Sequence, residues 1–487
     1  TAAHRRALAL DPALAQAHVN LGAALNADER SAAAEASLRR ALALDDGIAA
    51  AWTNLGSACA AQGRVVEAEA HHRRALALDA GLPDAHANLG HLLRRVGRDA
   101  EAEAAYRDAI AVAPRHAQAH YNLALLLLER GALRQGWAEH DWRFATAQFH
   151  GQGRRLAARA WRGENVAAAR VLVWREQGVG DEILFASCYP DLLARAGHGI
   201  IECDRRLVTL FARSFPGATV RPVSVDPRDA AVQVPAGSLA RYLRPALPRF
   251  PAAETGWLVP EPRRVALWRE RLAALGPGPK VGIGWRSSLM TQERQGAYTR
   301  LEEWGALFAV PGVVYVNLQY DDCADEIAEV EARFGVRVHR WADLDLKDDF
   351  EAAAALVANL DLVISPAMSA GELAGALGVP VWRFGGKDWT QLGTAVRPWY
   401  PSMRLVQPRP GEALASTLDR MARDLRRLAV PPEPPARPPR GDTVWDANVE
   451  DATVAAADVV AADVVAADVD EAVALYRGGD PAGAERR

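Results

Sequence analysis

The chain has 487 residues, half of them hydrophobic, and its formal net charge at pH 7 is −4. This length predicts two to four domains, each able to bury a core. The nearly balanced charge argues against a broad basic surface for nucleic acid.

The four cysteines are isolated, and no pair of them has the spacing of a metal site or a CxxC motif. Isolated thiols are typical of a reducing compartment, so we expect a cytoplasmic protein. No run of about 18 apolar residues is present, so we expect no transmembrane helix. The chain opens with Thr1 inside a repeat, and we therefore expect the natural N-terminus to lie further upstream.

Residues 1–145 repeat with a period of 34, which is the tetratricopeptide pattern of paired helices. Glycines at 63, 97 and 131 fall at the turn between the two helices, and Glu29 takes that place in the first full repeat. One repeat cannot bury its apolar face alone, so the units must stack into an α-solenoid. Four asparagines share one register within the first helix of each repeat: Asn20, Asn54, Asn88 and Asn122.

The asparagines have two interpretations. Asparagine is unfavourable inside a helix, so each one could satisfy a neighbouring turn. Alternatively, their carboxamides form a ladder that donates to and accepts from the backbone of an extended polypeptide. The repeats resemble those that precede the catalytic region of O-GlcNAc transferase, where such a ladder grips the acceptor, and this resemblance implies a protein partner in the groove.

The repeat period is lost after Trp137, and residues 137–162 are predicted to form a capping helix and a connector. Alternating strand and helix signals follow in two series, separated by a proline-rich stretch at 245–262. This arrangement predicts two Rossmann-like α/β lobes with a cleft between them, the GT-B architecture of many glycosyltransferases. We place the N-terminal lobe with its connector at 146–265, the C-terminal lobe at 266–430, and a proline-rich, low-complexity tail at 431–487.

The first candidate motif is the run from Gln177 to Asp181, which follows the apolar strand signal at 170–174. Its glycines, Gly178 and Gly180, allow a tight turn, and the next helix offers N–H groups to an anion. Asp181 could simply cap that helix. Residues 173–185 resemble the opening segment of the heptosyltransferase-like GT-B family, in which this aspartate is the proposed general base. The resemblance implies that Asp181 takes the proton from an acceptor hydroxyl.

Two further polar clusters follow predicted strands of the second lobe. Arg286, Ser287 and Ser288 end the strand that starts at Lys280, and they could present donors to a phosphate. Arg286 could equally be a surface arginine. Gln319 ends the next strand at the same predicted sheet edge.

The segment from Leu360 to Gly378 also resembles the heptosyltransferase-like family, but it departs from that family at donor-binding positions. Ala367 and Met368 replace the usual Asp-Thr, and Glu372 stands at the usual histidine position. These changes count against an ADP-heptose donor and leave either another nucleotide sugar or a degenerate site. We expect Ser369, Glu372, Lys387 and Asp388 to contact the donor.

Taken together, residues 1–410 resemble flagellin-modifying glycosyltransferases, which implies a protein O-glycosyltransferase that uses a nucleotide sugar and no other cofactor. The acidic pair Asp343 and Asp345 is predicted to lie in a loop rather than at a strand end, so we expect no metal. Two alternatives stay open: transfer to a glycan acceptor, and a non-catalytic repeat scaffold with a degenerate transferase domain.

Overall fold

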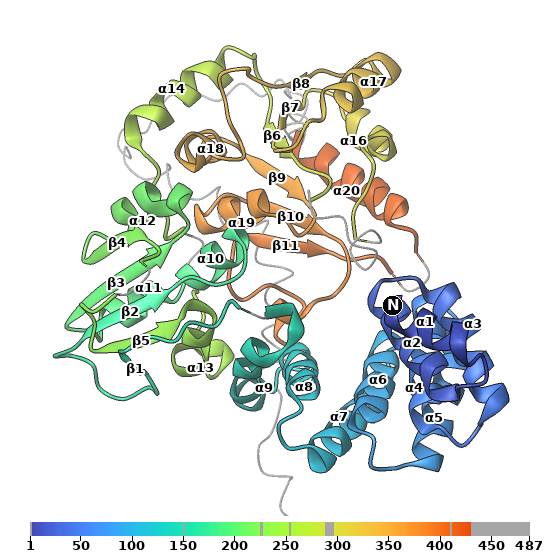
Figure 1. Ribbon diagram of the computed structural model, residues 1–487. Coiled ribbons are helices and arrows are strands. Elements are labelled where there is room, and N and C mark those ends of the chain that lie inside the picture. Colours follow the sequence, from blue (N-terminus) through green and yellow to red (C-terminus); the bar gives the residue numbers. More distant parts are fainter. Residues whose placement is uncertain are drawn as a thin grey trace, which may run out of the picture. The chain divides into compact units, whose positions relative to one another are not determined.

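A computed structural model describes residues 2–149, 151–224, 227–252, 255–287, 297–409 and 412–429. The predicted tail therefore lies outside the described residues, as does Ser288. In the described part, nine helices are followed by two parallel β-sheets with their helices (Figure 1). No described helix is both long and apolar enough to span a bilayer.

Close helix pairing in the arm explains why small residues recur at the repeat spacing. A Cβ atom added to Gly22, Gly56 or Gly90 would lie 2.5–2.8 Å from the side chain opposite it. The turn glycines have φ of 76–78°, and Glu29 adopts φ 58° in the same place, as its register predicts. The helices are α1 (Ala2–Leu10), α2 (Ala15–Ala27), α3 (Ser31–Leu44), α4 (Ala49–Ala61), α5 (Val65–Leu78), α6 (Pro83–Arg95), α7 (Asp99–Val112), α8 (Ala117–Glu129) and α9 (Leu133–His140).

The first sheet has the strand order β1-β5-β2-β3-β4, and all of its pairs are parallel. Two short 3₁₀ helices connect it to the arm, η1 (Asp141–Ala145) and η2 (Ala147–Phe149). Its elements are β1 (Arg159–Ala160), β2 (Arg170–Trp174), α10 (Val179–Ala186), α11 (Tyr189–Leu193), β3 (His198–Cys203), η3 (Arg205–Leu207), α12 (Val208–Ser214), β4 (Ala218–Pro222), β5 (Val232–Pro235), η4 (Ala236–Ser238), α13 (Leu239–Leu243) and η5 (Leu247–Arg249).

The second sheet is parallel too, with the order β11-β10-β9-β6-β7-β8. Both of its faces are buried: on β9, Val363 packs into one core cluster while Leu362 and Ile364 pack into another. Its elements are α14 (Pro262–Ala273), β6 (Lys280–Ile283), η6 (Leu301–Trp304), α16 (Gly305–Phe308), β7 (Val314–Asn317), α17 (Ala324–Phe334), β8 (Val338–His339), α18 (Phe350–Val357), β9 (Leu362–Ser365), α19 (Ser369–Ala376), β10 (Val381–Phe384), η7 (Trp389–Gln391), β11 (Met403–Val406) and α20 (Leu414–Ala429).

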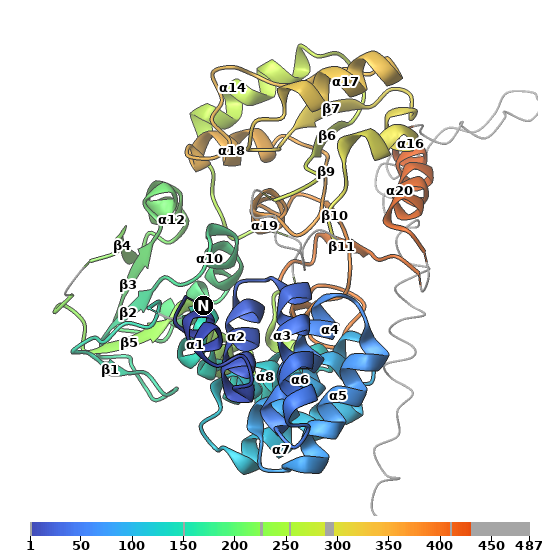
Figure 2. The same ribbon diagram turned by 45° about the vertical axis from the view of Figure 1, so that its right-hand side comes forward.

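The last repeat is packed into the α/β region. Leu128, Leu133 and Trp137 belong to the same core cluster as Leu392 and Trp399 from the second half of the chain. Helix α8 contacts η7. Helix α10 of the first sheet contacts α19 of the second (Figure 2). The described arm and the two sheets therefore meet around one region of the molecule.

Candidate functional site

A cavity of about 660 Å³ opens where the first sheet meets the second. The turn before α10 lines it from one side, and the start of α19 and the loop after β10 line it from the other. Because parallel α/β sheets bind ligands at the carboxyl ends of their strands, this is the expected position of a site. Eight predicted site residues are on its wall: Gly178, Gly180, Asp181, Ser287, Ser369, Glu372, Lys387 and Asp388.

The sequence allowed two positions for Asp181, in a helix cap and at a ligand cavity, and the residue occupies both. It lines the cavity, and its Oδ2 accepts a hydrogen bond of 3.2 Å from the backbone N–H of Gly178, which caps α10. The preceding residue, Gln177, adopts the left-handed region with φ 61°, an unusual conformation for a residue with a side chain. A local cap thus holds the carboxylate at the cavity wall.

Two helices begin at this cavity and approach each other closely. A Cβ on Gly180 in the first turn of α10 would lie 3.5 Å from Cγ of Glu372 and 3.7 Å from Cα of Ser369 in the first turn of α19. The first turns of both helices contribute to the wall. Helix N-termini carry partial positive charge, so the pair favours an anion between them.

The side chains of the wall add to this positive potential. Five cationic and three acidic side chains line the cavity, an excess of two positive charges. Arg383 pairs with Asp388 at 2.5 Å and Arg397 pairs with Glu372 at 2.6 Å. Burial alone would raise the pKa of Asp388, but Arg383, Arg397 and hydrogen bonds from Thr390 outweigh it and lower that pKa. The cationic residues of the wall are Arg206, Lys347, Arg383, Lys387 and Arg397.

Lys347 and Lys387 differ from the three arginines, because neither ammonium group has a carboxylate partner among the described residues. The chain contains three lysines in all, and two of them are on this wall. An ammonium group without an acidic partner suits a phosphate or carboxylate of a ligand.

Arg286 and Gln319 are placed differently from the expectation that they bind the donor, since neither is on the cavity wall. The Arg286 guanidinium lies 2.5 Å from Glu326 and 3.2 Å from Asp321, so its charge is already paired. Gln319 is buried, and its carboxamide bonds the backbone of Trp285 and Arg286. These contacts stabilise the segment that follows β6. The carboxylates that pair with Arg286 lie on later segments, so the strand-end pattern alone could not reveal them.

Several wall residues were missing from the sequence prediction. Arg206 follows β3, Lys347 precedes α18, and Arg383 and Arg397 surround the loop after β10. The scarcity of lysine could have drawn attention to Lys347. No local motif marks the arginines, because they reach the wall only through the crossing of distant segments.

The four asparagines of the arm all lie on the first helices, and successive first helices contact each other. Among the described residues, none of the four side chains bonds the backbone of a turn. A neighbouring asparagine, Asn26, donates 2.9 Å to the carbonyl of Asn54 within α4. Asn88 donates to Oγ of Ser57 at 3.2 Å, and Asn122 is buried, with 8% exposure, in the helix that contacts η7. The series therefore runs from repeat to repeat and ends beside the cavity loop.

A second cavity of about 560 Å³ lies near the carboxyl ends of β2 and β5, lined by aromatic rings such as Trp161, Trp174 and Tyr242. We place the candidate site in the larger cavity because Asp181, both helix starts and the two lysines are there. In the described residues, one group of potential metal ligands comes together, namely Cys59, Glu67 and His71 in the arm. Glu67 is paired with Arg64, and burial raises the pKa of the Cys59 thiol, which disfavours the thiolate that a metal needs.

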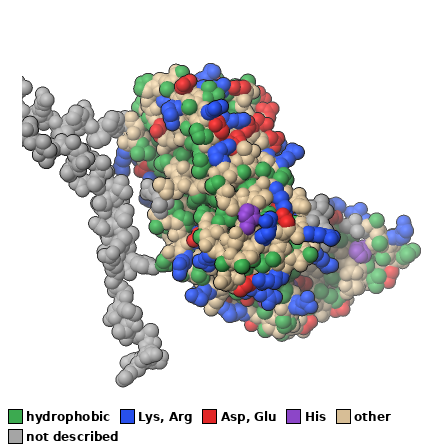
Figure 3. All heavy atoms as spheres, turned by 90° about the vertical axis from the view of Figure 1, so that its left-hand side faces the viewer, with side chains coloured by type: hydrophobic (Ala, Val, Ile, Leu, Met, Phe, Trp, Pro, Cys, Tyr) green, Lys and Arg blue, Asp and Glu red, His purple; other side chains and the backbone are tan. Residues whose placement is uncertain are grey.

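The charged side chains outside the cavity form no broad field of one sign on the face drawn in Figure 3, where basic and acidic groups are interspersed. This agrees with the near-neutral net charge.

Comparison with known proteins identifies the first region. A family model described as tetratricopeptide repeat matches residues 47–115. The arm is a tetratricopeptide repeat domain. Solved repeat structures similar to it include MamA, 24% identical over 28% of this chain and 81% of that one, with a TM-score of 0.26. YrrB, described as having an unusual peptide-binding site, is 20% identical over 30% and 76%, also with a TM-score of 0.26.

The PilF structure from Pseudomonas aeruginosa is 25% identical over 31% of this chain and 67% of that one, with a TM-score of 0.27. A curated relative, Protein FlbA of Caulobacter vibrioides, is 36% identical over 315 residues, which is 61% of this chain. The chain spans about half (53%) of the length of that relative. The match to FlbA is too long to be confined to the 145-residue arm, so part of the α/β region is also similar to it.

Proposed function

We propose that this protein is a metal-independent GT-B glycosyltransferase that moves a sugar from a nucleotide-sugar donor to a Ser or Thr hydroxyl of a protein held by the repeat arm. The observation that carries the proposal is the cavity between the sheets. There the capped carboxylate of Asp181 faces two converging helix starts and an excess of two positive charges. A site of this kind suits a donor whose leaving group is a phosphate.

In the proposed reaction the acceptor oxygen attacks the anomeric carbon while the bond from that carbon to the donor phosphate breaks. Asp181 takes the hydroxyl proton as the new carbon–oxygen bond forms. The negative charge that develops on the departing nucleotide is stabilised by the start of α19 and by the ammonium groups of Lys347 and Lys387. In this scheme the base comes from the elements of the first sheet, and the donor contacts come from those of the second.

The altered donor motif supports a donor other than ADP-heptose. Glu372 is engaged by Arg397, and Met368 replaces a polar residue on the cavity wall. Because Glu372 is paired with Arg397, we expect the donor to meet Lys347 and Lys387, which have no carboxylate partner in the part of the chain that the structure describes. A nucleotide sugar such as a nonulosonic acid linked to CMP would bring one phosphate and one carboxylate to these two ammonium groups.

The arm supports a polypeptide acceptor because its asparagine series ends at α8, which contacts η7 of the cavity loop. An extended chain along the first helices would be led toward the cavity wall. Flagellin, the acceptor implied by the resemblance, is the first protein to test.

The test compares Asp181→Asn with Asp181→Ala in a donor-turnover assay with a panel of nucleotide sugars and purified flagellin. Asparagine keeps an oxygen that can accept from the N–H of Gly178, so it preserves the cap while removing the base. We expect both variants to lose transfer by about 10²–10⁴-fold. Full transfer by Asp181→Asn would reject the assigned base.

The acceptor assignment is tested with the Asn54→Ala/Asn88→Ala double variant, for which Asn26→Ala is the control because Asn26 bonds the arm's own backbone. We expect the double variant to lose flagellin capture while it retains donor hydrolysis. Acceptor capture by the wild type without turnover of any donor would instead favour the scaffold alternative.

A further inference from the structure

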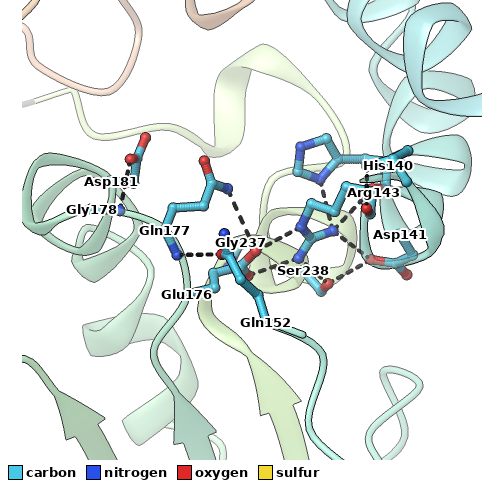
Figure 4. Close-up of polar contacts among 11 residues, drawn as sticks. His140, Asp141, Arg143, Gln152, Glu176, Gln177, Gly178, Asp181, Gly237 and Ser238 are labelled. Atoms are coloured by element: carbon cyan, nitrogen blue, oxygen red, sulfur yellow. Dashed lines mark hydrogen bonds and ion pairs between the residues drawn. The ribbon is translucent and has the colours of Figure 1, made fainter. Parts of the chain in front are cut away.

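The segment that closes the repeat arm sends one arginine into the interior of the α/β region. Arg143, on η1, has a fully buried side chain, and its guanidinium makes two hydrogen bonds of 2.7 Å to the equally buried carboxylate of Glu176 (Figure 4). Such a two-point contact fixes orientation as well as distance, because the planar guanidinium matches the carboxylate.

Glu176 directly precedes the turn that carries the proposed base. The same carboxylate accepts 2.7 Å from the backbone N–H of Gly237, so it ties this turn to the segment after β5. Next along the chain come Gln177, in its left-handed conformation, and Gly178, whose N–H is capped by Asp181. An unusual backbone conformation persists only where its surroundings hold it in place. The buried pair next to it contributes to that restraint, together with Gln152, whose Oε1 accepts 3.2 Å from the N–H of Gln177.

The rest of the guanidinium is held by the arm and by η4. Arg143 Nη2 donates 2.9 Å to Oγ of Ser238, and Nη1 donates to Asp141 at 3.2 Å and to Nδ1 of His140 at 3.1 Å. Burial, followed by the charge of Arg143, keeps the pKa of His140 well below its usual value, so the neutral ring can accept that bond. All the N–H groups of the guanidinium therefore have acceptors within this network.

The same short segment also contacts the opposite wall of the cavity. The rings of His140 and Trp389 lie 5.7 Å apart, and Trp137 and Trp389 lie 6.0 Å apart edge to face. Trp389 itself lines the cavity, two residues after Lys387. The end of the arm thus touches both the turn with Asp181 and the loop with Lys387.

We propose that Arg143 is a positioning residue, through which the end of the repeat arm holds the turn of Glu176–Asp181 in its reactive geometry. The inference rests on the proposed function for its kinetic part. It makes the arm a structural component of the site in addition to a means of holding the acceptor. Substitution of Arg143 should therefore displace Asp181 and lower kcat. The donor contacts of the second sheet should stay in place.

The experiment compares Arg143→Met, Arg143→Lys and the double variant Arg143→Met/Glu176→Gln in the full chain. The single Met variant leaves a buried carboxylate without its partner, which destabilises the fold. The double variant removes both charges and keeps an oxygen for the N–H of Gly237, so thermal stability should recover most of its loss. The double variant still lacks the contact between residues 143 and 176, so its kcat should remain at least tenfold below that of the wild type. Its donor KM should stay within twofold of the wild-type value.

Arg244→Met is the matched control. Arg244 is also buried, and it pairs with Asp191 at 2.7 Å in the same half of the molecule, but it bonds no residue of the turn. Its loss should lower stability without a selective fall in kcat. Arg143→Lys should restore part of kcat because lysine keeps the charge but supplies no planar fork.

Hydrogen exchange in residues 175–182 provides a readout that needs no activity. We expect faster exchange there in the Arg143→Met and double variants, and wild-type exchange in Arg244→Met. Recovery of both stability and kcat in the double variant, or unchanged exchange in that segment, would overturn the positioning role. Absence of transfer by the wild type would count against the proposed function alone, and the exchange comparison would still decide the inference.

Discussion

The contact between Gly393 and the last repeat offers a direct way to move the cavity loop. Gly393 has φ 79°, and a Cβ there would lie 2.7–2.8 Å from backbone atoms of Arg130 and Gly131. Ordinary carbon contacts begin at roughly 3.5 Å, so the Gly393→Ala variant must shift this loop or the repeat by about 0.7 Å. The loop carries Trp389 and Lys387 on the cavity wall, and a misplacement of about 1 Å can reduce a rate about 10²-fold. We therefore expect the kcat/KM of transfer to fall by about tenfold.

Gly97→Ala is the control for this substitution. Gly97 has φ 76° and lies at the repeat turn that corresponds to that of Gly131. A Cβ added to Gly97 would meet nothing within 4 Å. Both variants carry the left-handed strain of about 1–2 kcal/mol, and only Gly393→Ala adds overpacking of about 1–3 kcal/mol. Steady-state kinetics and hydrogen exchange in residues 385–394 measure the difference. Equal rates and equal exchange in the two variants would refute the reasoning.

Two further predictions concern a charge in the cavity and a titrating group in the arm. Lys387→Met should raise the donor KM about tenfold, because a charge-assisted hydrogen bond is lost. Lys387→Arg should restore most of the donor affinity in the same assay. An unchanged KM in the Met variant would remove Lys387 from the donor site. Burial lowers the pKa of His72 from 6.5 to about 4, so the unfolded chain binds a proton at a higher pH than the native arm does. Stability should thus fall by about 3 kcal/mol as the pH drops from 6.5 to 4. His72→Leu should abolish that loss in urea titrations at both pH values, since Leu38 occupies the same place in the first full repeat; an equal acid loss in the variant would exclude His72 as its cause.

The helical arm was predictable in detail because its signals are local. A period of 34 places small residues wherever two helices approach, and the turn position held by Glu29 has the same left-handed backbone as its glycine counterparts. The order of strands and helices in the α/β region was similarly readable, since short apolar runs alternate with helical patterns. Two parallel sheets follow from that alternation.

The candidate site was only partly predictable, and Arg286 illustrates why. A strand-end arginine beside serines has the composition of a phosphate site, yet Asp321 and Glu326 neutralise it from the next strand–helix unit. Whether a charge faces a ligand or a partner depends on which distant carboxylates the fold brings within about 4 Å. No spacing in the chain contains that information.

By itself the sequence determined the repeat arm, its asparagine register, the two α/β series and the glycine turn that presents Asp181, because each depends on residues close together in the chain. Only the tertiary structure decided which charges line the cavity, that Lys347 joins Lys387 there, and that Arg143 crosses from the arm to Glu176. The physical reason is that burial and charge pairing are properties of contacts between remote segments, and their free energies are defined only once the packing is complete.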